Sequence, residues 1–178
     1  MDINLLVNIT TRAWALPVLA ALHRGVPGRQ ASLLTATGAG RTALGLSFNH
    51  LISLGLLERN PGHGHPLRSE FRLTSAGISA AAMAHHLLDE ADETHHPLLR
   101  RAWTAPVLAT LQKPLRFNEI RRRLPPITDR ALSQTLVILE NGQWVERGVV
   151  NTARPPVALY STINQGRAMS EHLALALR

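Results

Sequence analysis

The chain has 178 residues, 45% of them hydrophobic and 17% charged, a composition that supports a folded core and excludes an intrinsically disordered protein. A formal net charge of +7 and a pI of about 11.5 favour a polyanionic partner such as nucleic acid. The absence of cysteine excludes a disulfide scaffold and a thiol redox switch. No apolar run approaches the roughly 20 residues of a membrane span, so we expect a cytoplasmic protein with no membrane partner.

The sequence contains an internal repeat. Residues 12–22 recur as residues 101–111, with eight of the eleven positions identical at an offset of 89. Further matches, such as 57–59 with 145–147, keep nearly the same offset. We therefore interpret the chain as a tandem duplication. One copy occupies residues 1–94 and the other residues 95–178, and each is the size of a small domain.

The first copy is predicted to consist of helices and one β-hairpin. Apolar periodicity and the repeat indicate helices over four ranges: 3–9, 12–24, 30–37 and 41–54. Two β-rich segments, 56–59 and 69–73, are expected to pair as a hairpin, because the segment between them is rich in glycine and proline. A last helix begins near Ser75, and His96-Pro97 marks the join to the second copy.

A short basic helix is expected early in the second copy, over residues 116–124. Phe117, Ile120 and Leu124 have the i, i+3, i+7 spacing of one helix face. Pro125 and the proline after it end this helix, because a residue before proline disfavours the helical conformation.

A second, longer helix is predicted over residues 128–141. Thr128 is a suitable N-cap, and the negative charge of Asp129 suits the first turn of a helix. Asn141-Gly142 is a helix-ending pair. The leucines of this segment fall on one face at i, i+4, i+7: Leu132, Leu136 and Leu139.

Two β-rich segments, 144–150 and 157–161, follow and predict a second hairpin, with a final helix over 164–177. The order of helix, helix and hairpin is that of a winged helix-turn-helix. The predicted fold class is therefore mainly α with small β-hairpins, an α+β winged helix. It is built as two tandem winged helix-turn-helix copies that form an intramolecular pseudo-dimer.

Several motifs in the second copy carry a family resemblance: Trp103, residues 115–120, Leu124-Pro125, residues 132–134, 139–140, 145–147 and 160–161, and Gly166-Arg167. On these residues the copy resembles the HxlR-type transcriptional regulators, a MarR-like branch of winged-helix proteins. The first copy resembles them only through Trp14, residues 56–59 and 71–74, and Gly77. The resemblance implies binding to operator DNA as a dimer, with the second helix of the motif in the major groove. This chain also lacks the cysteine that some members carry.

Candidate DNA contacts follow from this motif, because the exposed face near the N-terminus of its second helix reaches base edges. The expected base-reading residues are Arg130, Ser133 and Gln134, with Val137 beside them. The expected contacts to phosphates, which position the protein without specifying sequence, are Arg116, Asn118, Arg121, Arg122, Thr128 and, at the tip of the wing, Arg154. Alternatively, a basic run such as Arg121-Arg122-Arg123 is only a solvated face.

The first copy has lost most of these groups. At an offset of 88, Arg130 corresponds to Thr42, Ser133 to Gly45, and Gln134 to Leu46. Weaker contacts remain possible at five positions: Arg41, Thr42, His63, His65 and Arg68. Our hypothesis is that the second copy recognises sequence and the first is mainly its dimerisation partner.

Other functions find little support. Nine histidines invite a metal site, but adjacent histidines on a helix point apart and no carboxylate cluster accompanies them. Enzyme motifs are absent, so we expect no enzyme, no cofactor and no metal. Double-stranded DNA is the expected partner of a monomeric pseudo-dimer or a homodimer, and a small-molecule effector stays open. The competing interpretation is a winged-helix protein-interaction module, or an anti-regulator, with little specific DNA binding.

Overall fold

The computed structural model describes residues 1–60, 70–150 and 156–178. These residues are mostly helical with two small antiparallel hairpins, as in a winged helix-turn-helix fold. The first half contains α1 (Ile3–Thr10), α2 (Ala15–His23), α3 (Gln30–Thr37), α4 (Arg41–Ser53), β1 (Leu57–Asn60), β2 (Glu70–Leu73) and α5 (Ser75–Glu90). The second half contains η1 (Glu93–His95), α6 (His96–Leu99), α7 (Thr104–Thr110), α8 (Phe117–Arg123), α9 (Asp129–Asn141), β3 (Val145–Val150), β4 (Val157–Thr162) and α10 (Asn164–Ala176).

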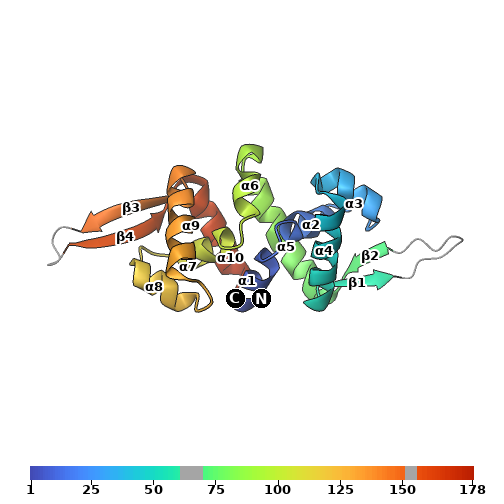
Figure 1. Ribbon diagram of the computed structural model, residues 1–178, viewed down its shortest axis with the longest axis horizontal. Coiled ribbons are helices and arrows are strands. Elements are labelled where there is room, and N and C mark those ends of the chain that lie inside the picture. The colour runs from blue at the N-terminus through green and yellow to red at the C-terminus, as the bar shows by residue number, and fades with distance from the viewer. Residues whose placement is uncertain (61–69, 151–155) are drawn as a thin grey trace, which may run out of the picture.

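The same order of elements therefore occurs twice (Figure 1). Helices α2, α3 and α4 are followed by a hairpin and the closing helix α5, and helices α7, α8 and α9 are followed by a hairpin and the closing helix α10. In the first hairpin Leu57 pairs with Leu73, and in the second Val145 pairs with Thr162. Backbone hydrogen bonds join the first hairpin to the segment before α3 and the second hairpin to the segment before α8. Phe71 N–H donates to Gly28 O at 2.7 Å, and Tyr160 N–H donates to Leu115 O at 2.8 Å.

The helix predicted over 12–24 begins later, at Ala15, and the reason is a proline. Residues 12–14 form a turn, so that Pro17 is the third residue of α2. A proline is tolerated in the first turn of a helix, where its missing N–H has no partner to lose. Pro106 is likewise the third residue of α7.

The end of α9 agrees with the prediction, because the helix ends at Asn141 and Gly142 is its C-cap. The residue with left-handed backbone is the next one, Gln143, with φ of 54°, whereas Gly142 has φ of −78°. At the predicted join near His96-Pro97 the chain forms η1 and α6, with His96 Nε2 2.9 Å from Leu88 O.

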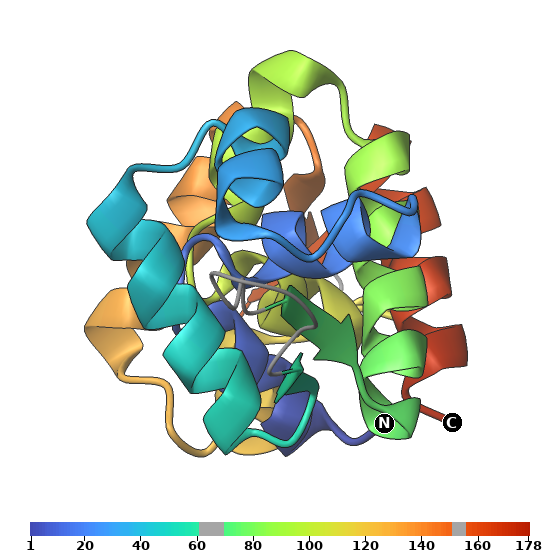
Figure 2. The same ribbon diagram turned by 90° about the vertical axis from the view of Figure 1, so that its right-hand side faces the viewer.

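The two halves meet where α5 and α10 pack against each other, and Figure 2 shows them as a green and a red helix running side by side. Each of these helices also packs inside its own half, α5 on α2 and α10 on α7. Small buried residues such as Ala80 and Ala84 line α5, and Met169 and Leu173 are fully buried on α10. The apolar faces of the two closing helices are thus used for packing.

The N-terminal helix α1 crosses from the first half to the second and packs on α7. Its Leu6 and Ile9 are fully buried. The amino group of Met1 donates to Ala176 O at 3.1 Å, so the two termini lie together (Figure 1). Within the described ranges no single helix is long and apolar enough to cross a membrane; α1 and α2 reach that length only together, across a bend of 105°.

Each hairpin is held against its closing helix by a glycine. A Cβ added at Gly77 would overlap the carbonyl oxygen of Leu56, and one added at Gly166 would overlap that of Trp144. The chain before each closing helix accordingly approaches the start of the hairpin closely enough for a backbone hydrogen bond. Thr74 N–H donates to Leu56 O at 3.1 Å, and Ile163 N–H donates to Trp144 O at 2.9 Å.

We predict that Gly166→Ala destabilises the protein by roughly 1–3 kcal/mol, because helix and strand must move apart. Gly45→Ala is the matched control: Gly45 lies in the middle of α4 with nothing near its added Cβ. That change should stabilise by about 0.5–1 kcal/mol through helix propensity. Thermal unfolding measures both, and an equal effect of the two substitutions would contradict the close-packing argument.

Candidate nucleic-acid interface

The turn between α8 and α9 is held at both helix starts. At α8, Glu119 Oε2 accepts the backbone N–H of Arg116 at 2.7 Å. At α9, Thr128 Oγ1 accepts the backbone N–H of Ala131 at 3.1 Å, so the predicted N-cap is present. Leu124 and Ile127 between the two helices are buried. Because the caps satisfy helix donors and the apolar residues fix the crossing, α9 is presented in one orientation.

Helix α9 has a buried face and an exposed face. Its leucines at 132, 136 and 139 are at most 2% exposed. Arg130, Ser133 and Gln134 are exposed on the other face, and Val137 is 54% exposed. The side chains with hydrogen-bonding groups thus point to solvent within the first two turns of the helix, where a major-groove helix contacts bases.

An open groove runs beside these residues. Its lining includes Ser133, Gln134 and Val137 from α9 and Arg101 from the segment before α7. Arg101 was not among the predicted site residues, although it is exposed and adds a cation beside Gln134. Its only sequence signal was its place in the repeated segment 101–111.

The predicted phosphate contacts differ in their exposure and in the ion pairs that their side chains already make. Arg116, Asn118 and Arg122 are exposed on or beside α8. Arg121 Nη1 lies 3.0 Å from Asp129 Oδ1, an ion pair between side chains that are 48% and 65% exposed. Surface pairs of this kind contribute about 0–1 kcal/mol, so Arg121 can exchange Asp129 for another anion. Arg123 instead donates to Thr110 O at 2.9 Å and braces α8 against α7.

The corresponding surface of the first half is nearly uncharged. Arg41 and Thr42 are exposed at the start of α4, and Leu46 is 49% exposed. In α3, Leu33 is buried and Thr35 is exposed where α8 carries its arginines. Four further predicted contacts lie outside the described residues: His63, His65, Arg68 and Arg154.

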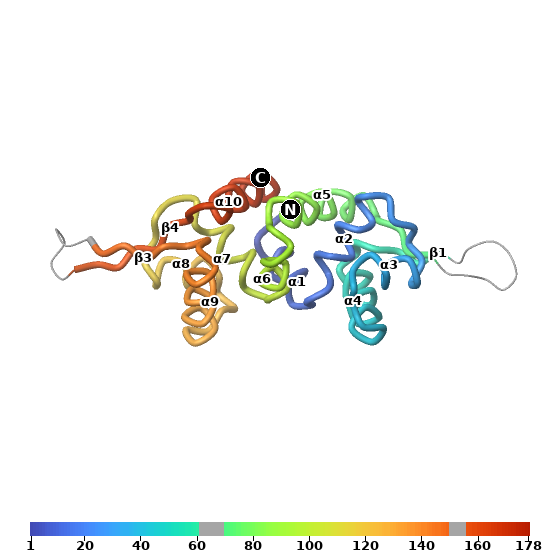
Figure 3. Tube along the Cα trace, turned by 90° about the horizontal axis from the view of Figure 1, so that it is seen from above, coloured from blue at the N-terminus to red at the C-terminus, as the bar shows by residue number. Residues whose placement is uncertain are grey.

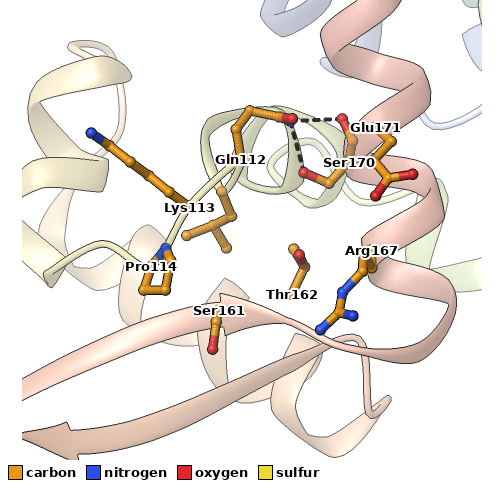
Figure 4. Close-up of a pocket in the computed structure, with 9 residues that line it drawn as sticks. Gln112, Lys113, Pro114, Ser161, Thr162, Arg167, Ser170 and Glu171 are labelled. Carbon is orange, nitrogen blue, oxygen red and sulfur yellow. Dashed lines mark hydrogen bonds between the residues drawn. The ribbon is translucent and has the colours of Figure 1, made fainter.

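The turn before α8 is anchored to the closing helix of its half. Gln112 Nε2 donates to Ser170 O at 2.7 Å and to Ser170 Oγ at 2.8 Å, and Ser170 Oγ donates to Leu108 O at 2.9 Å. Figure 4 shows these groups at the edge of a cavity of about 210 Å³, with Arg167 pointing toward the end of β4. These bonds connect α10 to the helix-turn-helix. Through α10 they also connect it to the contact between α5 and α10, the joint between the two halves.

The histidines form a row across the joint instead of a metal centre. His23 and His85 have ring centroids 4.9 Å apart, and His86 stacks on His172 of α10 at 5.4 Å. Within residues 1–60, 70–150 and 156–178, no group of three or more histidine or acidic residues is placed to hold a metal ion. The row links α2, α5 and α10 side by side.

Comparison with known proteins identifies the second half. The model of the HxlR-like helix-turn-helix family matches residues 98–176. This segment is an HxlR-like helix-turn-helix domain. A helix-turn-helix transcriptional regulator of uncharacterised role from Methanothermobacter thermautotrophicus (strain Delta H) is 40% identical to this chain over 68 residues. The match covers 38% of this chain and 51% of that protein, so the chain spans about half the length of its relative.

A solved structure, the reduced form of the transcriptional regulator YodB from B. subtilis, is 30% identical, with a TM-score of 0.41. The match covers 44% of this chain and 78% of that one. The HxlR-like family and the curated relative are transcriptional regulators and not enzymes. The resemblance inferred from the sequence of the second copy is therefore confirmed, and the expectation that no enzyme is present agrees with it.

Glu119 of the HxlR-like domain has a lowered pKa. The main cause is the hydrogen bond from the Arg116 backbone; burial opposes it, and the charges of Arg116, Arg122 and Arg123 lower the pKa further. A carboxyl whose pKa is lowered by folding stabilises the protein above its unfolded-state pKa and loses this effect as pH falls through the folded-state value.

We therefore predict that the wild type unfolds at a slightly higher temperature than Glu119→Gln at pH 7, by about 2 °C or less. The difference should vanish as pH falls through the folded-state pKa of Glu119, because Glu119 is then neutral, as the glutamine is at every pH. Glutamine keeps an acceptor for the Arg116 N–H, so the comparison isolates the charge. Melting curves from pH 7 to 3 measure it, and a difference independent of pH would contradict the assignment.

Proposed function

We propose that this chain is a sequence-specific double-stranded DNA-binding transcriptional regulator that inserts α9 into the major groove. The observation that carries the proposal is the division of α9: its leucines are in the core, and Arg130, Ser133 and Gln134 are exposed together at the N-terminal half. This helix is the second of a helix-turn-helix in a family of transcriptional regulators.

The exposed side chains match base edges. Arginine pairs with the O6 and N7 atoms of guanine through two hydrogen bonds, and glutamine pairs similarly with adenine. We assign these contacts to Arg130 and Gln134. Ser133 adds one further donor and acceptor, and the exposed Val137 suits a thymine methyl group.

Phosphate contacts surround this face. Arg116, Asn118, Arg121 and Arg122 come from α8 and its N-cap, and Arg154 is proposed for the wing. The Thr128 hydroxyl accepts the Ala131 N–H, which leaves its own O–H free to donate to a phosphate. Arg101 joins this set on the strength of its place in the groove beside Gln134.

We propose further that residues 1–94 and 95–178 are two winged-helix halves of an intramolecular pseudo-dimer. Figure 3 supports this: α4 and α9 lie on one side of the molecule, while α5 and α10 lie on the other. A single chain would then supply the two recognition helices that helix-turn-helix dimers bring to DNA. Light scattering at working concentration distinguishes the monomeric pseudo-dimer from a homodimer of the chain.

Substituting the two halves separately tests which one recognises sequence. Arg130→Ala should weaken specific binding by roughly 5- to 100-fold, since a two-bond contact to guanine contributes about 1–3 kcal/mol. Thr42→Ala, at the corresponding position of α4, should change it by less than about twofold. Fluorescence anisotropy with the selected DNA measures both. Equal losses from the two variants would remove the assignment of base recognition to α9.

Salt dependence counts the phosphate contacts. If the five arginines 101, 116, 121, 122 and 154 neutralise phosphates, the logarithm of the binding constant should fall against log salt with a slope of about −4.5. Contacts from Arg41 and Arg68 would steepen it to about −6.3. Weak binding that is equal for all sequences would instead favour the protein-interaction module, which the uncharged surface of α4 makes the second candidate.

A further inference from the structure

Helices α4 and α9 are equivalent in length and placement. Each has 13 residues and is followed by a residue with positive φ and then by a hairpin; that residue is Gly55 at 70° in one half and Gln143 at 54° in the other. They lie at opposite ends of the molecule and run in opposite directions in Figure 1, on the same side in Figure 3. A DNA duplex that contacts one of them on this side therefore extends toward the other.

The buried faces of the two helices match. Leu44, Phe48 and Leu51 of α4 are at most 2% exposed. At an offset of 88 these residues correspond to the buried leucines of α9. The fold of the first half therefore gives α4 the same support that α9 has.

The exposed faces do not match. At the same offset Thr42 replaces Arg130, Leu46 replaces Gln134, and Asn49 replaces Val137, and all three α4 residues are exposed. The charge at the helix start is also reversed, because Arg41 occupies the position that corresponds to Asp129 of α9. Helices α4 and α9 thus keep a similar apolar core face and differ in the residues of the surface that would face DNA.

We propose that the operator is non-palindromic and consists of two chemically unlike segments. This proposal rests on the proposed function, DNA binding through α9. Identical recognition helices related by two-fold symmetry bind inverted repeats, and unlike helices bind unlike segments. One segment carries the guanine and adenine contacted by Arg130 and Gln134.

The other segment is A·T-rich and lies one helical turn, about 10–10.5 base pairs, or a multiple of it away. Apolar side chains in the major groove contact the methyl group of thymine, and asparagine pairs with adenine through two hydrogen bonds. Leu46, which is 49% exposed, supplies the first kind of contact, and Asn49 supplies the second. The protein consequently binds in one direction along the DNA.

The test is selection of binding sites from random duplex DNA by the full chain. The wild type should enrich one guanine- and adenine-containing motif at a constant distance from an A·T-rich segment. An enriched inverted repeat of one motif would overturn the proposal while leaving the proposed function intact. Enrichment of no sequence at all would overturn the proposed function itself.

A triple variant sharpens the test by giving α4 the surface of α9: Thr42→Arg, Gly45→Ser and Leu46→Gln. All three positions are at least partly exposed, and a melting temperature no lower than that of the wild type checks that the fold is kept. The variant should enrich an inverted repeat of the motif read by α9 and bind it at least about tenfold more tightly than the wild type does. An unchanged preference would overturn the proposal.

A single variant isolates the contact of α4. Leu46→Ala should weaken binding to the composite operator by about 3- to 10-fold and leave binding unchanged when the A·T-rich segment is replaced by G·C pairs. Leu175→Ala is the matched control, because Leu175 is a 63% exposed leucine on α10, on the opposite side of the molecule. Equal losses on both DNAs, or an equal effect of the control, would remove α4 from the interface.

Discussion

The packing of α5 against α10 is the contact on which the rest of the structure depends. Each of these helices is also part of its own half, α5 against α2 and α10 against α7. The angle at this joint therefore determines where α4 and α9 lie relative to each other. His86 of α5 stacks on His172 of α10 there, with ring centroids 5.4 Å apart, and close-packed interfaces resist continuous deformation. The proposed presentation of α4 and α9 on one side requires that this joint is rigid.

A chain of short contacts carries that rigidity from the joint to the candidate DNA surface. Ser170 of α10 is bonded to Gln112, which lies just before α8, and Arg123 of α8 is bonded to Thr110 of α7. The caps at Glu119 and Thr128 then set the two helices of the motif. Each bond alone contributes about 1 kcal/mol. Together they place Arg130 and Gln134 on a support whose side chains are already ordered by hydrogen bonds, so that the support loses little entropy when DNA binds.

The sequence predicted the parts of this arrangement that follow from local periodicity and capping. The 3.6-residue spacing of Leu132, Leu136 and Leu139 located the core face of α9, and a threonine before an acidic residue located its start. It failed where tertiary contacts decide. The pair of Arg121 with Asp129 and the approach of Arg101 to Gln134 join residues on different elements. Gln143 adopts positive φ although Gly142 precedes it, because Trp144 N–H must reach Leu139 O, at 2.9 Å.

If α4 and α9 both contact DNA, as we propose, carrying both helices in one chain changes what a surface substitution does. In a homodimer, a leucine at the position of Gln134 would appear in both half-sites and remove two specific contacts, each of about 1–3 kcal/mol. In this chain Leu46 appears once, so the loss is confined to one half-site while α9 keeps its own contacts. The exposed face of α4 is therefore free to differ, whereas Leu44, Phe48 and Leu51 are not, because they hold the half that supplies the joint. The core faces of α4 and α9 therefore match while their exposed faces differ, because the two helices belong to one chain and not to two identical chains.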